Sequence, residues 1–297
     1  MLTAFILGVL FAFLTSFFFA LNSIATRRGV LTGYIFPSVF ISLLVGIPMY
    51  IILLPFCNDI NLLPKVTFYS LLPFIISGVI NYAIGRYTLY SAIHYIGSAI
   101  SVPIITTSQI IAAFIAIPLL HESVTLSKIL GLIISMIGVL LIASLPSNIR
   151  NFRLGVSLAI LSAFMFAFAA LIIRWGLIIF NAPIIGVITS YISATITYTI
   201  LMLTNKPKNL SILKIPKSVA IYIIPAGFLV NLGQLFKYLS LNLVEIGVYA
   251  PLLATYPLQT ILYSYITNRD IEIINLRVVI GTIMIFLGII FVFNPIT

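Results

Sequence analysis

Long apolar runs separated by short polar breaks follow one another along the entire chain. Each run is about twenty residues or longer, the length that a helix needs to cross the hydrocarbon core of a bilayer. The runs are continuously apolar and do not alternate with period two, so they predict helices and not the strands of a barrel. We therefore predict ten membrane spans, at about 4–26, 34–54, 68–90, 96–119, 126–145, 154–176, 183–204, 218–240, 246–267 and 276–294.

The first half of this pattern recurs in the second half. At a shift of 150 residues the matching pairs are Gln109 with Gln259, Glu122 with Glu272, Gly131 with Gly281 and Gly138 with Gly288. A second match, at a shift of 147 residues, aligns Arg27 with Arg174. Each copy holds five spans, an odd number, so the second copy enters the membrane from the opposite side. The sequence thus predicts an all-α membrane protein of ten transmembrane helices, built as two inverted five-helix repeats (1–147 and 148–297) around a central cavity.

The composition agrees with a membrane protein and excludes several other classes. The chain is 62% hydrophobic and 7% charged, whereas a soluble domain is roughly 25% charged. Its net charge of +10 comes from Lys and Arg residues scattered through short loops, so we expect contacts with lipid headgroups and no nucleic-acid partner. Cys57 is the only cysteine, which excludes an internal disulfide and a cysteine-based metal site. We expect the first apolar run to be a retained span and not a signal peptide, because no charged segment precedes it.

Short motifs near the ends of the spans carry a resemblance to a known family. They are Arg27–Arg28–Gly29, Tyr90–Ser91–Ala92–Ile93, Glu122 with Gly131 and Gly138, Ala254–Thr255–Tyr256–Pro257, and Glu272 with Gly281 and Gly288. The chain resembles the EamA-like families of the drug/metabolite transporter superfamily over essentially its whole length. The resemblance implies a carrier whose cavity is lined mainly by the third, fourth, eighth and ninth helices, with parts of the first and sixth. It also implies amino acids, other small metabolites, sugar phosphates or nucleotide sugars as substrates.

The orientation in the plasma membrane has two conflicting indicators. Ten spans put both termini on one side, and the resemblance implies that this side is cytoplasmic. The cytoplasmic loops would then hold only Lys65, Lys128 and Arg174, while the other loops would hold most of the Lys and Arg residues. The positive-inside rule, taken alone, therefore places the termini outside.

Two cations inside predicted spans are the main candidates for substrate binding. Arg86 lies in the third span and Lys237 lies near the equivalent position of the eighth. A cation within a span costs roughly 3 kcal/mol on insertion scales, so it normally faces a cavity or a partner. We predict that both bind an anionic group of the substrate, with Arg86 able to clamp a carboxylate or phosphate with two hydrogen bonds. The alternative is that both side chains extend to the membrane interface.

Polar and aromatic residues of the same spans complete the predicted cavity. The predicted substrate-binding residues besides the two cations are Asn81, Tyr82, Tyr87, Tyr90, Gln109, Asn231, Gln234, Tyr238, Tyr256 and Gln259. Ser101, Thr106, Thr107, Ser108, Tyr249 and Thr255 are further polar residues of these spans. Such groups fix the orientation of a ligand between apolar walls. Each of them also has an alternative role in helix packing or in the interfacial aromatic belt.

Other residues predict local geometry. Pro103, Pro251 and Pro257 lie inside the fourth and ninth spans and predict kinks there. Small residues at seven-residue spacing make one face of the fifth and tenth helices fit for close packing, as scaffold or as a dimer contact. We expect Glu122 and Glu272 each to accept backbone N–H bonds at the start of the next helix.

These observations predict a secondary carrier or facilitator of a small anionic or zwitterionic metabolite, an amino acid or related organic acid. We expect it to work by alternating access as an exporter, as a monomer or homodimer in the lipid bilayer and without a cofactor. A carrier of hydrophobic drugs or lipids and a non-transporting structural or regulatory subunit are the alternatives. An enzyme is not expected, because the two histidines and five acids show no metal-ligand spacing and no GxSxG or HExxH motif occurs.

Overall fold

The computed structural model describes residues 2–120, 125–145, 151–204 and 215–293, and these ranges contain helices and no strands. Nine helices in the described ranges are long and apolar enough to cross a membrane, namely Leu2–Val30, Ile35–Phe56, Phe68–Ile96, Ser98–Ile115, Leu126–Ala143, Phe152–Ile179, Pro183–Thr204, Lys217–Leu243 and Leu276–Phe293. They correspond to nine of the predicted spans. The remaining one, 246–267, is divided into two helices that are each shorter than a span.

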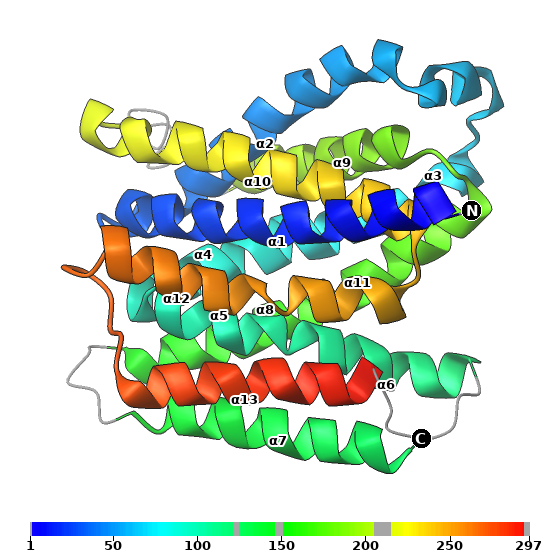
Figure 1. Cartoon of the computed structure of the whole chain (residues 1–297). Coiled ribbons are helices and arrows are strands. Elements are labelled where there is room, and N and C mark those ends of the chain that lie inside the picture. The colour runs from blue at the N-terminus through cyan, green and yellow to red at the C-terminus, as the bar shows by residue number, and fades with distance from the viewer. Residues whose placement is uncertain (1, 121–124, 146–150, 205–214, 294–297) are drawn as a thin grey trace.

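Figure 1 shows the helices packed side by side in one body. The first half contains α1 (Leu2–Val30), α2 (Ile35–Leu53), the short turns η1 (Leu54–Phe56) and η2 (Asn58–Lys65), α3 (Phe68–Gly78), η3 (Val79–Gly85), α4 (Arg86–Ile96), α5 (Ser98–Thr106), α6 (Ser108–Leu120) and α7 (Leu126–Ala143). The second half contains α8 (Phe152–Ile179), α9 (Pro183–Thr204), α10 (Lys217–Leu243), α11 (Ile246–Leu253), α12 (Tyr256–Thr267) and α13 (Leu276–Phe293). In Figure 1, α1 begins and α13 ends on the same side of the body.

The contact between α7 and α13 shows that the two repeats are inverted. A Cβ atom added at Gly131 would lie 2.5 Å from the carbonyl oxygen of Gly288, and one added at Gly138 would lie 2.6 Å from that of Gly281. The residue number therefore rises along one helix as it falls along its partner, so the helices are antiparallel (Figure 1). Because α7 and α13 are the equivalent last helices of the two copies, the copies have opposite orientations.

The two repeats are also interleaved. The first span of each copy packs against the third span of the other: α1 contacts α10 along its length, and α8 contacts α3, η3 and α4. This packing places residues of both repeats around the centre of the molecule. Apolar side chains that remain exposed cover the outer surface, where they suit contact with lipid.

The third and fourth spans of the first repeat depart from regular helix near the centre. The turn η3, just before Arg86, is a π-helix, a form that often marks a functional position. The fourth span breaks at Thr107, whose hydroxyl donates to the carbonyl three residues earlier at 2.6 Å. The ninth breaks at Thr255, which makes the same bond at 2.7 Å. Both breaks follow a proline, Pro103 or Pro251, within one turn.

The expectation for Glu272 is wrong in one respect. This carboxylate accepts backbone N–H bonds at the start of α5, from Ser98 at 2.8 Å and Ala99 at 3.2 Å, and not at the start of the next helix, α13. It also lies 3.7 Å from the Nε atom of Arg27. Because the repeats are interleaved, the loop of one repeat reaches a helix start of the other. The equivalent residue, Glu122, lies outside the described residues.

A candidate substrate cavity between the two repeats

One cavity lies where the two repeats meet. Its walls come from α1, η3, α4, α5 and α6 of the first repeat and from α8, α10, α11 and α12 of the second. These helices form the six spans that the family resemblance implies. About 70 Å³ of the cavity is open to the centre of a water molecule. One water needs roughly 10–15 Å³ by that measure, so the cavity has room for a small molecule.

Most of the predicted binding residues line this cavity. They are Asn81, Arg86, Tyr90 and Gln109 of the first repeat and Gln234, Lys237 and Tyr256 of the second. Their spans carry apolar residues on every face, and the structure shows which face points inward. Substrate binding by these residues remains a prediction.

The other predicted residues lie behind the wall or outside it. The Tyr82 hydroxyl donates to Gln234 at 3.1 Å, so Tyr82 supports a lining residue from behind. Tyr238 is buried against Ser190, with 2.9 Å between their hydroxyls. Gln259 donates to Ser16 at 3.0 Å. Tyr87 follows Arg86 by about 100° around the helix, and its side chain is 41% exposed on the outer surface.

Arg86 is held in place by residues of the two second spans. It is 2% exposed, which excludes extension to the interface in this structure. Its Nη1 atom donates to the Ser42 hydroxyl of α2 at 2.8 Å, and its Nη2 atom donates to the Tyr191 hydroxyl of α9 at 2.8 Å. Its Cζ atom also lies 4.7 Å from the centre of the Tyr82 ring, a cation–π distance. The guanidinium group is therefore fixed in orientation at the cavity wall.

Asn231 closes a ring of hydrogen bonds behind Arg86. Its side chain accepts from the Tyr191 hydroxyl at 2.7 Å and donates to the backbone carbonyl of Ser42 at 2.9 Å. Ser42 and Tyr191 were not among the residues predicted from the sequence. Both second spans carry several Ser, Thr or Tyr residues, so the sequence pattern did not single out these two.

Lys237 faces the cavity without a partner in the described part of the chain. It is 6% exposed, and no described residue accepts a hydrogen bond from it. No acidic residue of the described ranges lines the cavity. The two ion pairs between described residues, Arg27–Glu272 and Arg28–Asp270, lie at helix ends away from it. The cavity therefore holds two cations and no counterion from its own walls.

Two further polar atoms of the cavity wall have no hydrogen-bond partner among the residues that the structure describes. They are the Nδ2 atom of Asn81 and the hydroxyl of Tyr249, and both residues are 1% exposed. A buried polar group without a partner costs free energy, so such groups commonly have a ligand or water as partner. The amide nitrogen can only donate, and the hydroxyl can donate, which suits an anionic ligand.

The comparisons with known proteins agree with this architecture. The model of the EamA-like transporter family matches the chain twice, at residues 6–144 and 153–294. The predicted boundary between 147 and 148 lies in the gap between the two matches and stays a prediction. No curated protein sequence matches the chain. One solved structure, titled only as the crystal structure of a protein, superposes with a TM-score of 0.64 over 96% of both chains at 12% identity.

That structural likeness concerns the fold alone, whereas the family match covers nearly the whole length of both repeats. The chain therefore belongs to the EamA-like transporter family, and it is a multi-pass membrane transporter of small molecules.

Proposed function

We propose that the protein is a secondary carrier or facilitator of a small anionic or zwitterionic metabolite, an amino acid or related organic acid, which it exports by alternating access. The observation that carries the proposal is the pair Arg86 and Lys237, both buried in one cavity whose described walls contain no carboxylate. Buried charges are normally paired. A bound anion supplies the counterion that the walls lack.

A difference between the two ends of the cavity supports alternating access. Gly97 and Gly247 are equivalent in the two repeats, yet Gly97 is buried beneath the carboxylate of Glu272 and Gly247 is exposed. A Cβ atom at Gly247 would meet its nearest described neighbour, Phe293, at 4.0 Å. The start of α5 is thus covered by the opposite repeat, and the start of α11 is open among the described residues.

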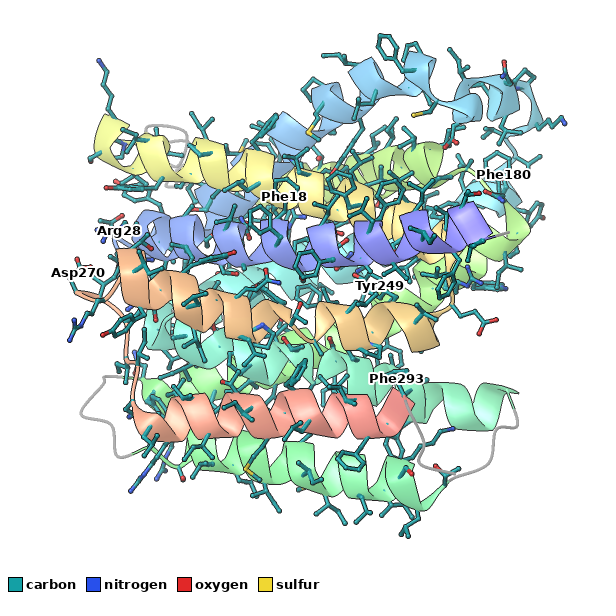
Figure 2. The ribbon with its side chains drawn as sticks, viewed as in Figure 1. Phe18, Arg28, Phe180, Tyr249, Asp270 and Phe293 are labelled. Carbon is teal, nitrogen blue, oxygen red and sulfur yellow. The ribbon has the colours of Figure 1, made fainter. Side chains whose placement is uncertain are left out.

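Further contacts close the same end. Arg28 pairs with Asp270 at 3.0 Å, and Asn268 donates to the backbone carbonyl of Ile24 at 3.0 Å. Figure 2 shows Arg28 and Asp270 together at one end of the helices, with Phe180 at the opposite end. These bonds join the first repeat to the second at the end where Gly97 is covered, as expected of a carrier closed on that side.

Ligand-dependent stabilisation of the purified protein tests the proposal. A ligand at 100 times its Kd stabilises the folded state by about 2.7 kcal/mol. We expect a thermal-shift screen of amino acids, organic acids, sugar phosphates and nucleotide sugars to find an anionic or zwitterionic ligand. The shift should disappear in Arg86→Gln and persist in Arg153→Gln, a control at an exposed arginine. A full response in Arg86→Gln would exclude Arg86 as the anion site.

The direction and the mechanism need a transport assay. We expect proteoliposomes loaded with the ligand found in the screen to release it through the wild-type protein and not through Arg86→Gln. An apolar wall that includes Phe19, Leu89 and Phe166 favours one rival function, the movement of hydrophobic drugs. Full transport of a neutral apolar compound by Arg86→Gln, with no response to any anion, would support that rival.

A further inference from the structure

We infer that the carried molecule is a small organic anion without an ammonium group, a carboxylate on a short apolar body, and not a zwitterionic amino acid. This inference rests on the proposed function and narrows its substrate class. It follows from the placement of the acids, from the unpartnered donors of the cavity and from its apolar walls.

The acids of the described chain are all engaged or placed elsewhere. Asp59 accepts backbone N–H bonds at the start of α9, at 2.7 Å from Ile184. Glu272 accepts those at the start of α5. Asp270 pairs with Arg28 at an exposed helix end, and Glu245 is exposed just before α11. An α-ammonium group entering the cavity would therefore meet two cations and no carboxylate of the wall.

The unpartnered groups of the wall suit a carboxylate. Asn81 offers an amide N–H, Tyr249 offers a hydroxyl, and Lys237 offers an ammonium group without a partner among the described residues. The Oε1 atom of Gln234, which could accept from an ammonium group, already accepts a hydrogen bond from Tyr82 at 3.1 Å. The amide oxygens of Asn22, Asn81 and Gln109 could also accept from a ligand, but they are uncharged, whereas two of the donors in the wall, Arg86 and Lys237, are cations. A carboxylate, which is an acceptor only, suits these charged donors.

The rest of the wall suits a short hydrocarbon body. Its apolar members include Phe19, Leu89, Ile105, Phe166, Val230 and Leu253, and they lie beside further polar residues such as Thr106 and Gln109. The cavity has about 70 Å³ open to the centre of a water molecule, which is room for a compact ligand. The wall therefore matches a compact branched or linear carboxylate.

A matched pair of ligands tests the inference. Leucine differs from 4-methylpentanoate only by its α-ammonium group. Calorimetry on the purified protein at pH 7.5 measures both Kd values, and titrations into empty detergent micelles give the background heat to subtract. We expect the Kd for 4-methylpentanoate to be at least tenfold lower than the Kd for leucine. Arg86→Gln and Lys237→Gln should each raise the Kd for 4-methylpentanoate at least tenfold, and Arg153→Gln should leave it unchanged.

A second variant tests the charge argument directly. Lys237→Glu places a carboxylate beside Arg86 in the cavity, and we expect it to shift the preference from 4-methylpentanoate toward leucine. Equal or tighter binding of leucine by the wild-type protein overturns the inference and leaves the proposed function intact. Binding of neither probe also overturns the inference. The proposed function fails as well only if no anionic or zwitterionic compound of the screen stabilises the protein.

Discussion

The Tyr191 hydroxyl stands between Arg86 and Asn231, accepting from the first at 2.8 Å and donating to the second at 2.7 Å. Tyr191 does not line the cavity, so its effect on a ligand passes through the guanidinium group that it holds. Orientation of a charged donor by neighbouring groups of this kind decides how much of its binding energy is realised.

We predict that Tyr191→Phe weakens binding of an anionic ligand by about tenfold to a hundredfold, because a hydrogen bond to a charged group contributes roughly 1.5–3 kcal/mol. Tyr198→Phe is the matched control: Tyr198 is a buried tyrosine of the same helix, and its hydroxyl donates to the backbone of Ala83 at 3.2 Å. Calorimetry gives the Kd of the anionic ligand for both variants. Equal losses in the two variants would assign Tyr191 a structural role only.

The unequal ends of the cavity predict unequal thiol reactivity. In a Cys57→Ser background, we expect Val248→Cys to react with a polar thiol reagent at least tenfold faster than Ser98→Cys in the purified protein. Ser98 is fully buried beneath Glu272, whereas the equivalent Val248 is partly exposed. Equal rates would contradict the closure of that end.

The same assay tests the bridge formed by Glu272. Adding Glu272→Gln to Ser98→Cys should raise the reaction rate, because the amide cannot pair with Arg27 and presents a donor to one of the two backbone N–H groups. Glu245→Gln is the control, since Glu245 is an exposed acid just before α11 and not part of this cluster. A rate that stays unchanged with Glu272→Gln would remove this residue from the closure.

Asp59, in the loop between the second and third spans, predicts a pH dependence of stability. Burial raises the pKa of its carboxyl group, although the backbone N–H bonds of Ile184 and Ile185 oppose the shift. A carboxyl group with a raised pKa in the folded state contributes stability below its ordinary pKa, near 4, and loses that contribution as the pH rises through the folded pKa. We therefore expect the Tm of the wild type, relative to Asp59→Asn, to fall from pH 4 upward. A constant difference would refute the prediction.

The backbone contact between α7 and α13 predicts that Gly138→Ala is destabilising. The added methyl group would lie 2.6 Å from the carbonyl oxygen of Gly281, and forced separation of packed elements costs typically 1–3 kcal/mol. Gly247→Ala is the control, because a Cβ atom there would meet its nearest described neighbour, Phe293, at 4.0 Å. Thermal denaturation in detergent compares the two, and equal Tm values would contradict the close contact.

Labelling of Cys57 on intact cells tests the orientation. Cys57 follows the second span and is partly exposed. If the termini are cytoplasmic, as the family resemblance implies, this position is cytoplasmic too, and an impermeant thiol reagent should label it only after permeabilisation. Labelling of intact cells would favour the positive-inside count instead.

The sequence predicted the spans and the repeats because both depend on features that are local or recur at a fixed shift. A helix of about twenty apolar residues is required by the bilayer whatever surrounds it. The paired glycines, such as Gly131 with Gly281, identified the duplication directly. The odd number of spans per copy then predicted the inversion that the α7–α13 contact shows.

The cavity-facing side of each helix was harder to predict. In a soluble protein the polar face of a helix points to water, but here both lipid and protein interior are apolar, so the pattern does not fix the rotation. Tyr87 is therefore exposed although its neighbour Arg86 lines the cavity. The partners of Glu272 and Arg86 could not be predicted either, because Ser98 is 174 residues from Glu272 and Tyr191 is 105 residues from Arg86 along the chain.

The packing of each repeat's first span on the third span of the other repeat also has a consequence for biosynthesis. The chain emerges from the ribosome with α4 well before α8, its packing neighbour, and α9, which carries Tyr191, follows later still. Arg86 thus enters the bilayer after Ser42 and Tyr82 have been synthesised but before Tyr191 and α8. The proposed anion site is therefore complete only once the second half of the chain is present.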